Sequence, residues 1–389
     1  MGRTVERSGM TRDEAFAALR RGDFRAAKQG LEVLAAATPS DVGVWMALAV
    51  AAQNLSDCAL ALTAVAHVLD LQPRNVAALL LKADLLAADG APREAAAFYN
   101  AAVRVAPPPD RQSPAMAREL ARARDAADAA RRRYEQGLHD ALAAAGFLDD
   151  PRYRQAHDIL VGRAQVHVQQ PLFFYFPGLP QRQVYDRAAF DWVPGLEAAT
   201  ASIAAEAEAL LGDTAAFRPY MHAGDGPRLT DSPLLDNPDW SACYLIERGR
   251  VVEDNARRCP ATMAALAGLP LCKVDGNMPS VLFSLLRPGT RIEPHHGLFN
   301  TRLICHLPLI VPAGGEDGKL GLRVGNTVCQ WRRGETIIFD DSIEHEAWNE
   351  TEAPRVVLLF DIWRPELTDR DRAFVARVFE ASGMAQISA

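Results

Sequence analysis

Residues 320–331, LGLRVGNTVCQW, form two short apolar runs that are separated by Gly325-Asn326. Both runs contain residues that favour β-strands, and a two-residue turn of this type joins antiparallel strands. The stretch therefore predicts a β-hairpin in which residues 320–324 pair with residues 327–331.

The sequence on either side of this hairpin continues the same pattern. Further short runs with β-branched and apolar residues, bounded by turn residues, occur at 281–286, 302–310, 335–339 and 355–362. Many short antiparallel strands with few helices between them favour a jelly roll. A helical stretch near residues 195–211 is expected to precede the strands. Because one fold can support many activities, the function must be argued from particular side chains.

Two histidines lie just beyond predicted strands. His295 follows a turn and a short strand, and His345 comes after the run that ends at residue 339. Such positions can converge at the mouth of a jelly roll. Non-haem Fe(II) oxygenases hold the metal with two neutral imidazoles and leave adjacent positions open for a 2-oxo acid and dioxygen. The alternative is a pair of hydrogen-bonded structural histidines, since the chain contains nine histidines.

Four further residues fit the carboxylates of 2-oxoglutarate. Arg355 opens a predicted strand after His345, and its planar guanidinium suits a bidentate grip on the distal carboxylate. Ser284 lies on the strand before His295 and can donate a hydroxyl to the same carboxylate. Arg302 and His306 are four residues apart on one strand, so they share a face. We expect this second pair to bind the metal-proximal carboxylate.

A period of 34 residues runs through the N-terminal third. It is marked by three prolines and two sets of three alanines, which are Pro39, Pro73 and Pro107, Ala15, Ala49 and Ala83, and Ala27, Ala61 and Ala95. Small residues let paired helices approach closely, and proline ends a helix because it has no N–H. The pattern resembles three tetratricopeptide repeats, whereas the alternative is an unrelated alanine-rich bundle. Such repeats form a concave surface, which predicts a peptide or protein partner in that groove.

The chain is thus predicted to be a multidomain α + β protein. An α-helical tetratricopeptide-repeat solenoid occupies residues 1–107 and is followed by a linker with capping helices at 108–165. A long helix is expected there from Pro114, with Ser113 as its N-cap. A double-stranded β-helix of the jelly-roll or cupin-like type is expected at 166–389.

An ordered series of motifs runs through the predicted β domain. It comprises SLLRPGT at 284–290, PHHG at 294–297, NTRL at 300–303, HL at 306–307, FDDS at 339–342, EHE at 344–346 with Trp348, Arg355, and DIWRPEL at 361–367. DWS at 239–241 and the segment 174–180 extend the series upstream. The region from about residue 170 to about residue 370 resembles the aspartyl/asparaginyl β-hydroxylase family, in which tetratricopeptide repeats also accompany this domain.

The resemblance implies a role for each matching residue. His295 and His345 would be the iron ligands. Ser284 and Arg355 would bind the distal carboxylate of 2-oxoglutarate, and Arg302 and His306 would lie near the other end of that molecule. Gly297 stands where most related oxygenases have Asp or Glu, so water would complete the coordination and Asp341 would orient that water. Trp240 and Trp348 are expected to line the substrate pocket, with plain packing as the alternative.

The implied activity is that of an Fe(II)- and 2-oxoglutarate-dependent dioxygenase that hydroxylates an unactivated C–H bond. Its cofactors would be Fe(II), 2-oxoglutarate and O₂, with ascorbate supporting activity in vitro. The favoured target is the β-carbon of Asp or Asn in a peptide or protein. A small-molecule or lipid substrate, a non-catalytic scaffold, and a cupin-like metal hydrolase or isomerase are the alternatives.

Composition limits the partners and the location of the protein. The formal net charge of -7 disfavours general affinity for nucleic acid or anionic membranes. No apolar run reaches the roughly 20 residues that span a bilayer, and the N-terminus lacks a signal-like segment, so a cytoplasmic location is expected. The six cysteines are scattered, which predicts reduced, mostly buried thiols but leaves a Cys259–Cys272 disulfide open.

Overall fold

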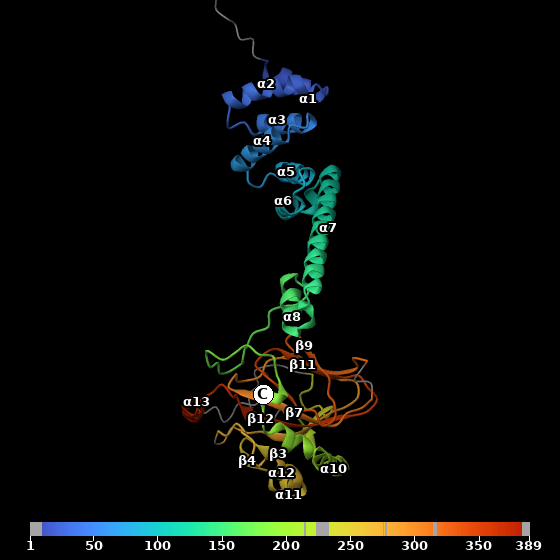
Figure 1. Cartoon of the computed structure of the whole chain (residues 1–389), viewed down its shortest axis with the longest axis vertical. Coiled ribbons are helices and arrows are strands. Elements are labelled where there is room, and N and C mark those ends of the chain that lie inside the picture. Colours follow the sequence, from blue (N-terminus) through green and yellow to red (C-terminus); the bar gives the residue numbers. More distant parts are fainter. Residues whose placement is uncertain are drawn as a thin grey trace, which may run out of the picture. The chain divides into compact units, whose positions relative to one another are not determined.

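The computed structural model describes residues 10–213, 215–222, 233–274, 276, 278–313 and 317–382. The chain divides into two compact units, Met1–His157 and Asp158–Ala389 (Figure 1). The division falls inside the segment 108–165 that the sequence predicts as a linker. None of the helices in the described ranges is long and apolar enough to cross a membrane.

The N-terminal unit begins with three helical hairpins. Their helices are α1 (Arg12–Arg20), α2 (Phe24–Ala37), α3 (Val42–Asn54), α4 (Cys58–Leu71), α5 (Val76–Ala88) and α6 (Pro92–Val105). The second helix of each hairpin starts at residue 24, 58 or 92, which keeps the predicted period. Asp23 and Asp57 cap two of these helices by accepting hydrogen bonds from the backbone N–H groups of Ala26 and Leu60.

The repeated residues have the structural roles that their spacing predicts. All six repeated alanines are buried where the helices pack, namely Ala15, Ala49, Ala83, Ala27, Ala61 and Ala95. Gly22, Ser56 and Gly90 occupy the same turn in successive hairpins, and each has a positive φ, between 60° and 82°. Glycine adopts this left-handed conformation without a steric cost. The N-terminal unit is therefore a helical repeat array.

The long helix α7 (Pro114–Ala144) closes this array, as expected. The Oγ of Ser113 accepts a hydrogen bond from the backbone N–H of Met116 at 3.2 Å, which confirms the predicted N-cap. Ala123 and Ala127 pack into one apolar cluster with residues of α5 and α6. The shorter helix α8 (Pro151–Leu160) follows.

The C-terminal unit contains two antiparallel β-sheets. The larger sheet has the order β1-β10-β7-β12-β5-β3-β2, with β4 also paired to β3, and the smaller has the order β6-β11-β8-β9. The strands are β1 (Val184–Tyr185), β2 (Arg218–Pro219), β3 (Trp240–Glu247), β4 (Arg250–Val251), β5 (Val281–Leu286), β6 (Thr290–His295), β7 (Arg302–Ile310), β8 (Leu320–Val324), β9 (Thr327–Cys329), β10 (Ile337–Phe339), β11 (His345–Asn349) and β12 (Arg355–Trp363).

Helices cover the outer face of the larger sheet. They are α9 (Val193–Ala198), α10 (Thr200–Leu211), α11 (Glu253–Arg258) and α12 (Pro260–Leu266), and α13 (Asp369–Ser382) follows the last strand. Leu196 and Ile203 pack with Phe283 and Phe360 on that face. A separate apolar cluster lies between the sheets and takes residues from both. The larger sheet is thus buried on two faces, and the space between the sheets is where the candidate site lies.

The predicted strands match the structure closely where apolar runs are long. Residues 281–286, 302–310 and 320–324 form strands with those bounds, and Val324 pairs with Thr327 across Gly325-Asn326, so the predicted hairpin is confirmed. The predicted strand 327–331 ends earlier, at Cys329, because the chain turns there to bury Trp331 between the sheets. Two longer strands, β3 and β11, were not expected, and neither were the two-residue strands β1, β2 and β4.

The six cysteines are all free thiols. Cys243, Cys259, Cys272 and Cys305 are buried, which confirms the expectation of mostly buried, reduced cysteines. The Cys259–Cys272 bridge that the sequence leaves open is not formed.

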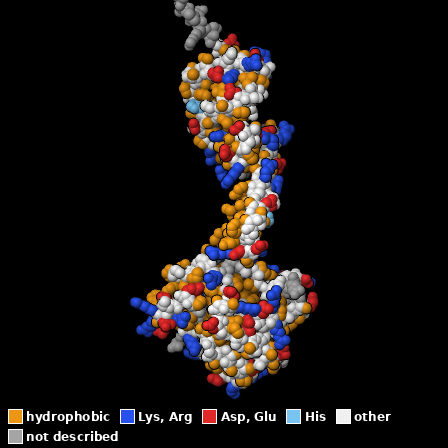
Figure 2. All heavy atoms as spheres, viewed as in Figure 1, with side chains coloured by type: hydrophobic (Ala, Val, Ile, Leu, Met, Phe, Trp, Pro, Cys, Tyr) orange, Lys and Arg blue, Asp and Glu red, His pale blue; other side chains and the backbone are white. Residues whose placement is uncertain are grey.

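Acidic and basic side chains both occur over each unit on the face that Figure 2 shows. That face presents no large area of basic side chains alone among the described residues.

Candidate active site

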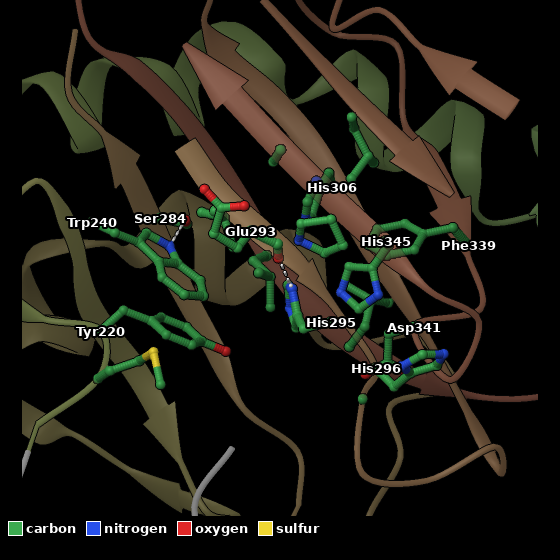
Figure 3. A pocket seen from close by; sticks show the side chains of 18 of the residues that line it. Tyr220, Trp240, Ser284, Glu293, His295, His296, His306, Phe339, Asp341 and His345 are labelled. Atoms are coloured by element: carbon green, nitrogen blue, oxygen red, sulfur yellow. Dashed lines mark hydrogen bonds between the residues drawn. The ribbon is translucent and has the colours of Figure 1, made fainter. Parts of the chain in front are cut away.

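A cavity of about 420 Å³ opens between the two sheets (Figure 3). Both sheets contribute to its wall. Eight residues that the sequence singles out line it, namely Trp240, Ser284, His295, Arg302, His306, Asp341, His345 and Arg355. The fold therefore brings together residues that are as much as 115 positions apart in the chain.

His295 and His345 face each other across two neighbouring strands. His295 is the last residue of β6 and His345 is the first of β11, and they are direct partners in the strand register. Their ring centroids are 4.1 Å apart. The structure thus brings the two histidines together, although His345 begins a strand rather than following one.

Main-chain carbonyl groups set the tautomer of both histidines. Nδ1 of His295 lies 2.8 Å from the carbonyl oxygen of Glu293, and Nδ1 of His345 lies 3.1 Å from that of Ile343. A carbonyl oxygen can only accept a hydrogen bond, so each Nδ1 carries the proton. The lone pair of each Nε2 is therefore free for a ligand.

Burial keeps these two imidazoles neutral. It lowers the pKa of His295, and it lowers the pKa of His345 well below the ordinary histidine value, with the neighbouring His295 as a further cause. No group of three or more His, Cys, Asp or Glu side chains that could hold a metal ion is found among the described residues. The fit to a metal rests instead on two adjacent neutral imidazoles with free Nε2 atoms.

Asp341 fills the space beside Gly297. A Cβ added to Gly297 would lie only 2.1 Å from Oδ2 of Asp341. That oxygen accepts a hydrogen bond from Nη2 of Arg302 at 3.0 Å, whereas the buried Oδ1 has no hydrogen-bond partner in the described part of the chain. Burial raises the pKa of Asp341 to about 6, and Arg302 opposes the rise. A carboxylate oxygen thus stands where a side chain at position 297 would otherwise be.

Arg302 is engaged by two carboxylates. Besides its hydrogen bond to Asp341, its Nη1 lies 3.6 Å from Oδ2 of Asp361, another buried residue. The cavity wall includes Arg302, yet its guanidinium is already paired within the protein. Sequence reasoning did not assign a role to Asp361, although it opens the DIWRPEL motif.

Arg355 is a buried cation without a carboxylate partner among the described residues. Its side chain is 1% exposed, and Nη1 donates to the carbonyl oxygen and to Oγ of Ser284 at 3.1 and 3.4 Å. Burial lowers the pKa of Arg355 to about 9. Trp240 also donates from Nε1 to Oγ of Ser284 at 3.3 Å and stacks on Tyr220. An uncompensated buried cation beside a hydroxyl fits an anionic ligand.

His306 interacts electrostatically with His345 and with Arg355. Trp331 donates from Nε1 to Nδ1 of His306 at 3.4 Å. Burial lowers the pKa of His306 to about 3, and the charge of Arg355 adds to this effect. Sequence reasoning missed a role for Trp331 and for Tyr220. The signal for Trp331 was a single indole among the polar and glycine residues of the segment 330–335.

Trp348 does not line the cavity, so its prediction as a pocket residue is wrong. Successive side chains of a strand point to opposite faces, and β11 turns His345 and Ala347 toward the cavity. Trp348 therefore lies on the outer face, where Nε1 donates to the carbonyl oxygen of Gly318 at 2.8 Å. Arg291 lies over its ring at 5.3 Å.

A buried ion pair supports the loop that carries Asp341. Nη1 of Arg364 lies 2.6 Å from Oδ2 of Asp340, and both side chains are fully buried. Arg364 also donates to the carbonyl oxygens of Asn300 and Pro180, and Gln169 donates to the same oxygen of Asp340. The pair thus ties three separate segments to the loop before β11.

Arg364→Met should lower the free energy of unfolding by about 3–5 kcal/mol, because it leaves the charge of Asp340 buried and unpaired. Urea denaturation of the full chain, followed by the signal of the C-terminal unit, measures this loss. Arg377→Met is the matched control, since Arg377 pairs with Glu380 on the exposed surface of α13. Equal midpoints for the two variants would contradict the structural role of the buried pair.

Comparison with known proteins identifies relatives of the C-terminal unit. Residues 197–365 match the family model of aspartyl/asparaginyl beta-hydroxylase. The ornithine lipid ester-linked acyl 2-hydroxylase of Rhizobium tropici is 35% identical over 187 residues, 47% of this chain and 60% of that protein. Aspartate beta-hydroxylase domain-containing protein 2 of Homo sapiens is 32% identical over 54% of this chain and 55% of its own. The aspartyl/asparaginyl beta-hydroxylase of Homo sapiens is 35% identical over 36% of this chain and 18% of its own.

The chain spans less than two thirds of the length of each of these relatives. Among solved structures, the translocator chaperone SycD of Yersinia enterocolitica is similar over 31% of this chain and 81% of its own, with 16% identity and a TM-score of 0.28. A TPR protein of Thermus thermophilus is similar over 38% of this chain and 76% of its own, with 19% identity and a TM-score of 0.26. Likenesses this distant carry no conclusion about function.

Proposed function

Because this chain belongs, through its C-terminal unit, to the aspartyl/asparaginyl β-hydroxylase family, we propose that it is an Fe(II)- and 2-oxoglutarate-dependent dioxygenase that hydroxylates an unactivated C–H bond. The observation that carries the proposal is the tautomer of the histidine pair. Both Nε2 atoms are free, and the same cavity is lined by Arg355, a buried arginine that has no carboxylate partner among the described residues.

The strand order supports a double-stranded β-helix as the architecture of this unit. From β5 to β12 the chain passes repeatedly between the sheets: β5, β7, β10 and β12 lie in the larger sheet, and β6, β8, β9 and β11 lie in the smaller one. All of the pairings are antiparallel. A jelly roll closes in this way and places a cavity between its sheets.

Each residue of the cavity would have a defined task. His295 and His345 would hold the iron through Nε2, and Arg355 with Ser284 would bind the distal carboxylate of 2-oxoglutarate. His306 would donate a hydrogen bond nearer the metal, and Asp341 would accept one from water through its unpaired Oδ1. When bound, iron and 2-oxoglutarate supply the oxidative chemistry with O₂, while the protein positions the reactants and limits access of water.

Arg302 is better suited to hold Asp341 than to bind the cosubstrate directly. Its two Nη atoms already approach Asp341 and Asp361. We therefore assign it to keeping the Asp341 carboxylate in place, and His306 becomes the main candidate for the metal-proximal end of the cosubstrate.

The proposed substrate is an Asp or Asn side chain of a peptide or protein, hydroxylated at the β-carbon. The helical repeats support this choice, because stacked hairpins present a surface that suits an extended peptide. A relative of this chain is named an aspartyl/asparaginyl beta-hydroxylase. We also keep the cytoplasm as the proposed location.

A lipid substrate is the second candidate, and one observation favours it. Leu172 lines the cavity while 42% of its surface stays exposed, and Phe173 and Tyr175 beside it are 39% and 50% exposed. An apolar rim of this kind suits an acyl chain. One relative is named as an acyl hydroxylase of ornithine lipid.

Turnover of 2-oxoglutarate tests the proposed function. The full chain with Fe(II), ascorbate and 2-oxoglutarate should form succinate only when O₂ is present. Metal-dependent turnover without O₂ would support the hydrolase or isomerase alternative instead. If the protein neither forms succinate nor binds 2-oxoglutarate, while His295→Ala still captures a partner, the chain is a scaffold. Mass spectrometry of captured peptides and lipids for a gain of one oxygen then separates the two substrates.

Arg355→Lys should weaken the binding of 2-oxoglutarate by roughly 10- to 150-fold. A lysine keeps the charge but loses the planar fork, and hydrogen bonds to charged groups contribute about 1.5–3 kcal/mol. Calorimetric titration of the Mn(II)-loaded protein without O₂ measures the Kd. Arg323→Lys is the control, because Arg323 pairs with Glu344 and Glu346 away from the cavity. An unchanged Kd in Arg355→Lys would remove Arg355 from the cosubstrate site.

A further inference from the structure

We propose that Trp331 is the positioning residue of the 2-oxoglutarate site, acting on two of its groups at once. Its indole N–H decides which nitrogen of His306 carries the proton, and its ring face supports the guanidinium of Arg355. This inference rests on the proposed function and adds a residue that lies behind the cavity wall.

The N–H edge of the Trp331 indole contacts His306. Trp331 is 3% exposed, and its Nε1 lies 3.4 Å from Nδ1 of His306, which is 7% exposed. An indole N–H can donate a hydrogen bond but cannot accept one, so Nδ1 of His306 must present its lone pair. Because burial keeps this imidazole neutral, its one proton lies on Nε2. His306 can therefore donate a hydrogen bond from Nε2.

This arrangement is the reverse of that in the histidine pair. In His295 and His345 a carbonyl oxygen holds the proton on Nδ1 and leaves Nε2 free to bind a metal. In His306 the indole holds the lone pair on Nδ1 and leaves Nε2 as a donor. Four histidines line one cavity (Figure 3), and the backbone or indole partners of His295, His345 and His306 divide these three into two ligands and one donor for an anion.

The face of the Trp331 indole contacts Arg355. The guanidinium carbon of Arg355 lies 4.4 Å from the centre of the Trp331 ring. Arg355 donates to Ser284, yet its Nε has no partner and no carboxylate pairs with it among the described residues. An aromatic face attracts such a cation without neutralising it. Trp331 therefore supports the arginine while leaving its charge available to a carboxylate.

The local fold fixes the indole in this position. Trp331 belongs to the apolar cluster between the sheets, in the turn between β9 and β10. Two backbone hydrogen bonds hold the rest of this turn. The N–H of Gly334 donates to the carbonyl oxygen of Pro308 on β7, and the N–H of Thr336 donates to the side chain of Glu197 on α9. The turn after β9 thus carries a residue that contacts both ends of the proposed cosubstrate site.

Trp331→Phe separates the two contributions, because it keeps an aromatic face and removes the N–H. In full-length protein labelled with ¹⁵N-histidine, wild-type His306 should show the Nε2–H tautomer, assigned by the loss of its signals in His306→Asn. Trp331→Phe should shift His306 toward a mixture of tautomers. It should also raise the Kd for 2-oxoglutarate on the Mn(II)-loaded protein by roughly 3- to 10-fold, the usual effect of one neutral hydrogen bond.

Two further variants complete the test. Trp331→Leu removes the ring face as well and should weaken 2-oxoglutarate binding more than Trp331→Phe does. Trp348→Phe loses the same kind of N–H on the outer face of β11 and should leave both the His306 signals and the Kd unchanged.

The outcomes separate this inference from the proposed function. If wild type binds 2-oxoglutarate but Trp331→Phe changes neither the tautomer nor the Kd, Trp331 has no positioning role and the proposed function stands. If wild type does not bind 2-oxoglutarate, the proposed function and the role of Trp331 toward that ligand both fail. If Trp331→Phe does not fold, the wild-type ¹⁵N spectrum still decides, because an Nδ1–H tautomer at His306 overturns the inference.

Discussion

His345→Ala is expected to bind Fe(II) at least about 100-fold more weakly than wild type and to form no succinate. Loss of a residue that merely orients a metal ligand costs about 10- to 100-fold in affinity, and loss of a ligand costs more. The proposed site has only two protein ligands, and the remaining His295 would hold the metal through one bond. Anaerobic titration with Fe(II), or with Mn(II) followed by electron paramagnetic resonance, measures the affinity.

His296→Ala is the most informative control for this prediction. His296 follows a proposed ligand directly and also borders the cavity, but it has no strand partner like the one that holds His345 opposite His295. We expect this variant to retain most of its metal affinity. If His296→Ala loses the metal and His345→Ala keeps it, the assignment of His345 as a ligand is wrong.

The sequence predicts an element correctly where several independent sequence markers for that element agree. In the N-terminal unit, the 34-residue period places a proline, two alanines and a turn residue in each hairpin, so several independent markers agree. In the C-terminal unit, the apolar runs of β5, β7 and β8 are continuous and their bounds are predicted correctly. Where the local signal is weak, tertiary context alone determines the element.

The two longer unexpected strands, β3 and β11, illustrate that limit. β11 has the sequence HEAWN, which is poor in typical strand residues, and it becomes a strand because β6 and β8 pair with it on both sides. β3 has mostly buried residues at its start instead of a clean alternation, since the larger sheet is covered on both faces. Neither pairing partner can be inferred from these short segments themselves.

The candidate site shows the same division between local and long-range information. Its residue types are set by motifs, so the histidines, Arg355 and Ser284 could be named from the sequence. The tautomers of these histidines could not be predicted from the sequence, because they depend on partners such as the carbonyl oxygen of Ile343 and the indole of Trp331. The wrong expectation for Trp348 came from proximity to His345 in the chain, without the strand alternation that turns it outward.

Gly297→Asp, which would restore the carboxylate that most related oxygenases have at this position, should abolish activity and weaken metal binding. The new Cβ would lie 2.1 Å from Oδ2 and 2.4 Å from Cγ of Asp341. Asp341 cannot easily move away, because Arg302 holds its carboxylate and its carbonyl oxygen accepts from the backbone N–H of Gly297 at 2.6 Å. Overpacking of this kind costs about 1–3 kcal/mol, and two buried carboxylates in contact would add repulsion.

Two companion variants separate the steric effect from the electrostatic one. Gly297→Ala adds only the Cβ, so it should lower the melting temperature while leaving the charge of the site unchanged. The double variant Gly297→Asp with Asp341→Gly moves the carboxylate from one residue to the other and removes the clash, so it should recover metal affinity relative to Gly297→Asp alone. Tighter metal binding in the single Gly297→Asp variant than in wild type would show that the space beside Gly297 is open after all. Recovery in the double variant would instead show that Asp341 occupies, from the loop before β11, the place of the missing carboxylate.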